Sequence, residues 1–306
     1  MTGSSMREVS AVTESKRQAL VLTQHGSVAA DLVSACKRAG VTPSLLTLAG
    51  MRSGSADRKL VRMRREQSER ILQIGLRTRT SVHVAPDYAE LKRIILSFKP
   101  TLLVVRGFPL RLDVEILDAA ELGGVNFHPS PLPQFRGKYP LQHMLVAGEP
   151  HVMMTGHWMT PDLDCGPILE RAEGDALPAS TVEELWASTD EVGRQIYGRV
   201  IARALDGAVG WVQEQEKASE ANDFPRGFLC LDAERTDRTM LMRYVLAGQL
   251  GTPNPRPVCL HLAGGERLSV VGVRDDSSEG ISVSLASEQK CVVMIGTSEG
   301  VDDDCQ

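Results

Sequence analysis

The sequence predicts an α/β protein in which a Rossmann-like, mostly parallel sheet is followed by a smaller β-rich domain with an OB-like barrel. Two observations support this fold class. Up to residue 128, short apolar runs alternate with segments of helical apolar spacing, which is typical of parallel strands joined by crossover helices. Beyond residue 257, four short apolar runs are separated by Gly, Asp and Ser, a pattern that predicts strands without intervening helices.

The first half of the chain contains the strands and helices that predict the parallel sheet. Strands are expected at residues 19–23, 43–48, 81–85, 102–105 and 124–128. Helices are expected between them, at residues 27–38, 56–74, 87–98 and 112–120. Because ligands of open parallel sheets bind outside the carboxyl ends of the strands, we expect a site just after residue 128.

The second half of the chain continues the α/β domain and then changes character. We expect a helix at residues 140–147, extended segments at 152–160 and 168–173, and a long helix from 181 to about 205. One helix preceded by a turn is expected in residues 230–250, followed by strands at 258–262, 268–273, 281–285 and 291–295. The predicted division is a disordered tail at 1–16, the α/β domain at 17–206, a connector at 207–229 and the β-rich domain at 230–306.

Composition and charge narrow the class of protein. The 306 residues are 42% hydrophobic and 24% charged, with a net charge of -5, which is ordinary for a soluble globular protein and disfavours a general nucleic-acid binder. No apolar run approaches the roughly 18 residues of a membrane span, and residues 1–16 do not resemble a signal peptide, so we expect a cytoplasmic protein with no membrane partner. Six cysteines without Cys-x-x-Cys pairs predict reduced thiols and no metal site.

A polar motif stands at the end of the fifth predicted strand. Asn126 and His128 are two residues apart, so they project from the same face of the strand. An amide can donate a hydrogen bond to an oxygen that gains charge in a tetrahedral intermediate, while an imidazole can accept or relay a proton near neutral pH. A later carboxylate, Asp164, could orient the ring and favour its charged form. The three side chains together predict an acyl-transfer site.

These residues lie in stretches that resemble the formyltransferase family that uses 10-formyltetrahydrofolate. The similarity runs in order through Leu102-Leu-Val-Val-Arg-Gly, Gly124-Val-Asn-Phe-His-Pro-Ser-Pro-Leu-Pro, Arg136-Gly137 and Asp162-Leu-Asp-Cys-Gly-Pro-Ile-Leu. The resemblance implies that residues 17–206 are the catalytic domain, that Asn126, His128 and Asp164 are catalytic, and that no metal is required. It also implies that the donor's pterin ring lies against two segments, with the candidate folate-binding residues Val104, Arg106, Gly107, Phe108, Leu110, Pro161, Asp162 and Leu163.

The acceptor is not specified by the motif. Candidate acceptor-binding residues follow it: Ser130 could contact substrate or cap the turn, Arg136 could bind an anion or hold the loop, and Lys138-Tyr139 stand where many family members have small residues. Residues 230–306 carry seven Arg or Lys against twelve Asp or Glu, which is unfavourable for a tRNA clamp. We therefore expect a small-molecule amine, such as an amino sugar nucleotide or a biosynthetic intermediate, with methionyl-tRNA as the disfavoured alternative.

Other interpretations stay open at this stage. Water in place of the amine would make the protein a formyltetrahydrofolate hydrolase. Pro131 and Cys165 depart from the family pattern, which leaves room for a folate-binding module without turnover. No complete Gly-x-Gly-x-x-Gly motif is present, which argues against a nicotinamide-dependent oxidoreductase. The basic segment at residues 52–79 could attract an anionic ligand or form a solvated helix face, and the oligomeric state is open, with a homodimer as one option.

Overall fold

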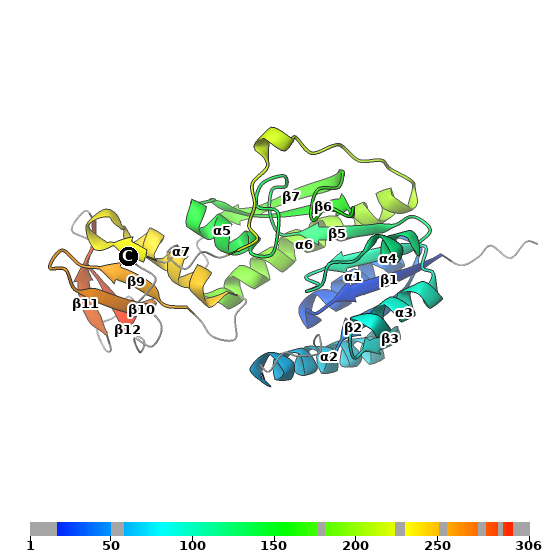
Figure 1. Ribbon diagram of the computed structural model, residues 1–306, viewed down its shortest axis with the longest axis horizontal. Coiled ribbons are helices and arrows are strands. Elements are labelled where there is room, and N and C mark those ends of the chain that lie inside the picture. The colour runs from blue at the N-terminus through cyan, green and yellow to red at the C-terminus, as the bar shows by residue number, and fades with distance from the viewer. Residues whose placement is uncertain are drawn as a thin grey trace, which may run out of the picture.

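The computed structural model describes residues 17–49, 58–176, 181–223, 230–250, 256–274, 280–286 and 290–295 (Figure 1). The expected tail at residues 1–16 and the last residues of the expected connector, 224–229, lie outside the described residues. Within the described part, no helix combines the length and the apolar character that crossing a membrane requires.

A seven-stranded sheet forms the centre of the larger part of the molecule (Figure 1). In chain order its strands are β1 (Gln18–Thr23), β2 (Thr42–Leu48), β3 (Ser81–Ala85), β4 (Leu102–Arg106), β5 (Gly124–His128), β6 (His151–Trp158) and β7 (Ile168–Ala176). The spatial order is β3-β2-β1-β4-β5-β6-β7, in which the first five strands are parallel and the last two join antiparallel. The predicted mostly parallel sheet is confirmed, and the order reverses direction at β1 and β4, where ligands of such sheets bind.

Helices cover both faces of this sheet. Their bounds are α1 (Gly26–Arg38), α2 (Arg58–Thr78), α3 (Tyr88–Phe98), α4 (Val114–Asp118), α5 (Pro140–Ala147) and α6 (Val182–Leu205). One apolar cluster joins α1 and α6 to the strand residues Val104 and Phe127. A second cluster joins α3 and α4 to Leu103 and Val105 on the opposite face. Since Asn126 is the register partner of Val105, it lies on the α3 and α4 side of the sheet.

Local chemistry explains several element boundaries. The helix expected to begin at residue 87 begins one residue later, because Asp87 is its N-cap and accepts a hydrogen bond from the Glu90 N–H at 2.9 Å. Asp113 caps α4 in the same way, through the Ile116 N–H at 3.0 Å. Helix α2 pairs Arg62 with Glu66 on its exposed surface, which agrees with the interpretation of the basic segment as a solvated helix face.

A second, five-stranded sheet follows α6 and the connector, which contains the short helix η1 (Gln215–Lys217). Its elements are β8 (Cys230–Asp232), η3 (Ala233–Arg235), α7 (Arg238–Gln249), β9 (Val258–His261), β10 (Arg267–Arg274), β11 (Ile281–Ser284) and β12 (Lys290–Ile295). The spatial order is β11-β12-β10-β9-β8, and only β8 and β9 are parallel. Helix α7 connects the two parts, because Leu246 and Leu250 belong to the apolar cluster that contains α1 and α6.

Two expectations for the C-terminal part need correction. The segment expected to be a turn and one helix begins as strand β8, because Cys230 to Asp232 pair with β9, and only Arg238–Gln249 is α-helical. The β-rich character is confirmed, but an OB-like barrel is not. Among the described residues, β11 and β8 are the two ends of an open strand order and do not pair with each other.

Candidate active site

The end of β5 places an amide and an imidazole on one face of the sheet, as the two-residue spacing predicts. Asn126 is partly exposed, whereas the His128 side chain is only 5% exposed. The neighbouring strand β6 pairs His157 with Asn126 in the antiparallel register. The carboxyl end of β5 therefore presents its polar residues beside those of β6, at the edge where the crossover pattern places a site.

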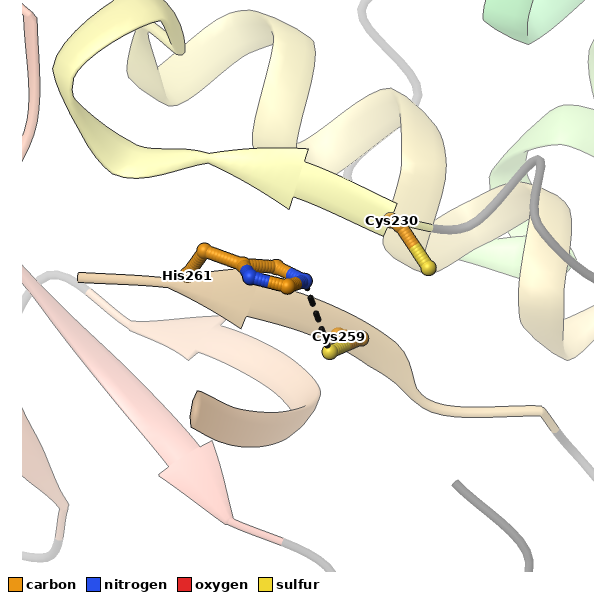
Figure 2. Close-up of side chains that lie close together, drawn as sticks. All are labelled: Cys230, Cys259 and His261. Carbon is orange, nitrogen blue, oxygen red and sulfur yellow. Dashed lines mark hydrogen bonds between the residues drawn. The ribbon is translucent and has the colours of Figure 1, made fainter. Parts of the chain in front are cut away.

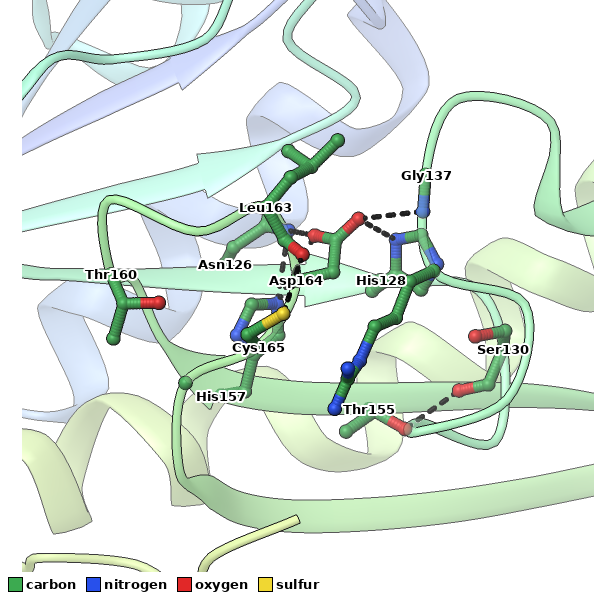
Figure 3. A network of polar contacts seen from close by, with 12 residues as sticks. Asn126, His128, Ser130, Gly137, Thr155, His157, Thr160, Leu163, Asp164 and Cys165 are labelled. Atoms are coloured by element: carbon green, nitrogen blue, oxygen red, sulfur yellow. Dashed lines mark hydrogen bonds and ion pairs between the residues drawn. The ribbon is translucent and has the colours of Figure 1, made fainter. Parts of the chain in front are cut away.

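Asp164 joins these two side chains into one network (Figure 3). Its Oδ1 accepts a hydrogen bond from Asn126 Nδ2 at 3.2 Å, and its Oδ2 lies 3.5 Å from His128 Nδ1. Oδ2 also accepts the backbone N–H of Gly137 at 3.0 Å. Asp164 itself has a left-handed backbone with φ of 54°, a conformation that Asp tolerates better than most residues. The loop after β6 thus turns back sharply to aim this carboxylate at β5.

His157 is a member of the network that the sequence analysis did not identify. Its Nε2 lies 3.2 Å from Asn126 Nδ2 and 3.5 Å from Asp164 Oδ1, while its Nδ1 lies 2.8 Å from the Trp158 carbonyl oxygen. The carbonyl requires a proton on Nδ1, so Nε2 accepts from the Asn126 amide. One signal in the sequence could have found His157. In an antiparallel pair, directly opposite residues point to the same face, so the β6 residue opposite Asn126 lies on the Asn126 face.

The charges in this network are set by burial and by hydrogen bonds. Burial alone would raise the pKa of Asp164, but His128, His157 and the Gly137 N–H together hold it well below its usual range. Burial lowers the pKa of His128, and the Asp164 carboxylate and the Phe135 carbonyl only partly oppose this. We expected Asp164 to favour a charged ring; instead, burial outweighs that effect, so a neutral imidazole stands beside an ionised carboxylate at pH 7.

The loop after β5 holds the predicted acceptor-binding residues in two different settings. Ser130 is fully buried and donates to the Gln134 carbonyl at 2.8 Å, which is the turn-stabilising role. Lys138 is exposed, and its ammonium lies 4.9 Å from the centre of the Tyr139 ring. Lys138 is therefore open to solvent and Tyr139 is partly exposed, whereas Ser130 is not accessible.

Arg136 is buried and hydrogen-bonded to the connector. Its Nε and Nη2 donate to Gln213 Oε1 at 3.1 and 2.7 Å, and its Nη1 donates to Gln215 Oε1 at 3.0 Å. Of the two roles considered for Arg136, holding the loop is the one that these contacts fulfil.

Gln213 is a second residue that the sequence analysis missed. It is 3% exposed, and its Nε2 donates to the carbonyl oxygens of Asp164 at 2.8 Å and of Gly166 at 2.7 Å. The same side chain accepts from Arg136, so one amide clamps the loop after β5 to the loop that carries Asp164. The connector runs on alongside the first loop, where the Ala221 N–H donates to the Arg136 carbonyl at 2.6 Å.

The predicted folate-binding residues divide between the two faces of the sheet. Val104 is buried in the cluster with α1 and α6, and the Arg106 guanidinium pairs with Asp190 at 2.7 Å, so neither side chain faces Asn126. Phe108 and Leu110 pack partly buried against the opposite cluster, on the side of Asn126. Gly107 has φ of 58° and lies against the His25 ring, where a Cβ would come within 2.3 Å of it.

The second predicted folate-binding segment forms the other loop beside Asn126. Leu163 is 48% exposed, and the Pro161 carbonyl accepts a hydrogen bond from the Arg111 guanidinium. The Asp162 carbonyl accepts from the Thr160 hydroxyl at 2.9 Å. Leu163 is therefore a half-exposed apolar side chain. Figure 3 shows it beside Asp164.

Comparison with known proteins shows the family to which the chain belongs. The family model described as formyl transferase matches residues 16–201, which is more than half of the chain and includes Asn126, His128 and Asp164. The chain belongs to the formyl transferase family. Outside the matched range lie the connector with Gln213 and the whole second sheet.

Individual known proteins are similar to different parts of the chain. A methionyl-tRNA formyltransferase from Bacillus subtilis is 27% identical over 208 residues, covering 68% of this chain and 62% of its own length. The chain thus spans less than two thirds of that relative. Among solved structures, HypX from Aquifex aeolicus in complex with tetrahydrofolic acid has a TM-score of 0.56 at 13% identity, covering 91% of this chain and 44% of its own. WlaRD, a sugar 3N-formyl transferase, has a TM-score of 0.59 at 12% identity, covering 92% and 98%.

Proposed function

We propose that this protein transfers a formyl group from 10-formyltetrahydrofolate to an amine of a small-molecule acceptor. The observation that carries the proposal is that Asp164 meets both other residues at the carboxyl end of β5: it accepts a hydrogen bond from Asn126 and lies 3.5 Å from His128 Nδ1. Acyl transfer to an amine needs an N–H donor for the oxyanion and a base for the amine proton, and these side chains are of those two types.

The proposed reaction moves one formyl group and one proton. The amine nitrogen attacks the formyl carbon, and the formyl oxygen becomes an oxyanion that one N–H of Asn126 stabilises after this N–H has exchanged its bond to His157 Nε2 for the oxyanion. Neutral His128 takes the proton from the attacking nitrogen, and the resulting imidazolium is stabilised by Asp164. The bond between the formyl carbon and the folate nitrogen then breaks, His128 returns the proton to that nitrogen, and tetrahydrofolate leaves. His128 Nε2 lies 2.8 Å from the Phe135 carbonyl oxygen and therefore carries the proton of the neutral ring, so the atom that would accept the amine proton is Nδ1, which lies 3.5 Å from Asp164 Oδ2.

For the donor, we propose that the pterin ring lies between the two segments on the Asn126 side of the sheet. Phe108 and Leu110 supply one apolar wall and Leu163 the other. The contribution of Val104 and Arg106 is proposed to come through their backbone, because their side chains face the α1 and α6 side. The tetrahydrofolic acid bound to HypX and the 5-N-formyl-THF present with WlaRD support a folate donor.

For the acceptor, we propose a small amine such as an amino sugar nucleotide or a biosynthetic intermediate. The exposed Lys138 and the partly exposed Tyr139 follow Gly137, whose N–H donates to Asp164, and these two side chains would contact the acceptor. The likeness in fold to a sugar 3N-formyl transferase is consistent with this class. A second candidate acceptor is methionyl-tRNA, which the similarity to the Bacillus subtilis relative favours. The excess of acidic over basic residues at positions 230–306 weighs against it.

A formyl-transfer assay tests the proposal and separates the acceptors. Purified protein and 10-formyltetrahydrofolate are incubated with a panel of amino sugar nucleotides, amino-acid derivatives and methionyl-tRNA, and mass spectrometry scores the gain of one formyl group. Turnover of the donor without any amine would instead indicate a hydrolase. On the correct acceptor, Asn126→Ala should lower kcat by about 10²- to 10³-fold. The partly exposed His151, on the same strand as His157, provides a control: His151→Ala should keep parental activity. Parental activity in Asn126→Ala and His128→Ala would refute the proposed mechanism.

A further inference from the structure

Two cysteines and a histidine meet between β8 and β9, far from the candidate active site along the chain (Figure 2). Cys230 and Cys259 are register partners in these parallel strands, and His261 is two residues beyond Cys259, on the same face of β9. The two sulfur atoms and one ring nitrogen all lie within 4.8 Å of one another. Thiolate sulfur and imidazole nitrogen are the donors that Zn²⁺ prefers in proteins.

The spacing of these atoms suits a tetrahedral zinc ion. With Zn–S of about 2.3 Å and Zn–N of about 2.0–2.1 Å, two ligands of a regular tetrahedron are separated by roughly 3.6–3.8 Å. Cys259 Sγ and His261 Nε2 are 3.5 Å apart, so this pair already has the required separation. The two distances to Cys230 Sγ are at most 4.8 Å, so they need to shorten by no more than about 1 Å.

The oxidation state of Cys230 controls whether all three donors are available. Cys230 is disulfide-bonded, whereas Cys259 is a thiol. This finding also corrects the expectation that all cysteines are reduced, which holds for Cys36, Cys165, Cys259 and Cys291 among the described residues. A disulfide sulfur is a poor metal ligand, because zinc binds the thiolate. The site therefore offers two metal donors, Cys259 and His261, when Cys230 is oxidised, and three when Cys230 is reduced.

We propose that Cys230, Cys259 and His261 form a zinc site that binds the ion only after Cys230 is reduced. A dithiol reductant would give two electrons to the disulfide and become oxidised itself, leaving Cys230 and the sulfur bonded to it as thiols. Zn²⁺ would then replace the thiol protons of Cys230 and Cys259 and take the lone pair of His261 Nε2, with two protons released and a water molecule as fourth ligand.

The position of Cys230, Cys259 and His261 in the second sheet suggests that a bound zinc ion would stabilise the fold. Strand β8 has only three residues and lies at the edge of the second sheet, where it pairs with β9 alone. A metal bridging Cys230 to Cys259 and His261 would tie this edge strand to the sheet. Because metal that binds only the folded form stabilises it by mass action, zinc should raise the melting temperature of the reduced protein.

Zinc binding by the whole chain tests the proposal. Protein without a polyhistidine tag is reduced with a dithiol, freed of it by gel filtration without oxygen, and titrated with Zn²⁺ against a chromogenic chelator. One zinc ion per chain is expected for the reduced protein. Changes beyond the ligand shell already weaken metal sites by about 10- to 100-fold, so Cys259→Ser and His261→Asn should each weaken binding by more than that. Cys291→Ser is the matched control, since Cys291 is another buried thiol of this sheet, and it should bind zinc as the parent does.

Several outcomes would overturn the proposal. Reduced protein that binds no zinc would exclude the site, and so would parental affinity in His261→Asn, a change at a partly exposed residue that spares the thiols. Equal affinity in the oxidised protein would exclude the redox control. The readout is independent of formyl transfer, so it neither relies on nor tests the proposed function.

Discussion

Replacing Gln213 with leucine should disable the active site from a position outside the family-matched range. The Gln213 amide accepts two hydrogen bonds from Arg136 and donates one each to the carbonyl oxygens of Asp164 and Gly166. Leucine has a similar volume and makes none of these bonds. The loop that carries Asp164 would then lose one of its links to the loop after β5, while the bond from the Gly137 N–H to Asp164 remains.

The structure gives the expected size of two losses in Gln213→Leu, one in folding stability and one in kcat. Four buried hydrogen bonds, each contributing about 0.5–1.5 kcal/mol, amount to about 2–6 kcal/mol of folding stability in Gln213→Leu. Asp164 has a positive φ and depends on its surroundings to stay in that conformation. A displacement of about 1 Å in a catalytic group can cost about 10²-fold in rate, so we expect kcat to fall by about that factor.

Steady-state kinetics on the correct acceptor, together with thermal unfolding, measures both quantities. Gln213→Glu separates the bonds that Gln213 accepts from the bonds that it donates. A carboxylate still accepts from Arg136 but cannot donate to the carbonyl oxygens of Asp164 and Gly166. It should therefore lose activity while Arg136 stays paired. Gln215→Leu is the control, since Gln215 is exposed and accepts a single bond from Arg136. If Gln213→Leu folds and retains kcat within about twofold of the parent, the positioning role is wrong.

Three further predictions follow from the same geometry. Because burial lowers the pKa of His128 and the neutral ring is the proposed base, kcat should fall on acidification with a midpoint below 6.5, which a pH–rate profile measures; a midpoint above 6.5 would contradict it. Gly137→Ala should lower kcat and stability, because φ is 119° there and a Cβ would come within 2.3 Å of the Asn222 amide oxygen; parental kinetics would show that the loop adapts. Asp190→Asn leaves the buried Arg106 charge unpaired and should cost about 3–5 kcal/mol by denaturant unfolding, whereas a loss below about 1 kcal/mol would mean that water reaches the pair.

The α/β part of the fold could be predicted closely because its inner strands β1, β2 and β4 are buried on both faces and its strands are bounded by turn residues. Strands β3 and β5 and helix α5 have the predicted bounds, and the other strands differ by one or a few residues. The start of the second sheet could not be predicted. Cys230 to Asp232 is too short for a periodic pattern, and it becomes a strand only because β9 lies beside it.

The candidate site was predictable where it depends on local spacing or on ordered motifs. Asn126 and His128 share a face for a local reason, and Asp164 entered through the resemblance. The contributions of His157 and Gln213 could not be read from spacing. His157 reaches the network through an antiparallel register, and Gln213 reaches it from a connector that returns 49 positions later in the chain.

By itself, the sequence determined the alternation of strands and helices, the polar pair at the end of β5 and membership of a formyl-handling family, because these follow from short-range periodicity and contiguous motifs. Tertiary structure decided which face each residue serves and which distant groups meet. It turned Arg106 away from Asn126 toward Asp190, made His128 neutral through burial, clamped Asp164 with Gln213, and brought Cys230 to Cys259 and His261. Strand register, burial and contacts between residues distant in the sequence are long-range properties, and no local sequence pattern encodes them.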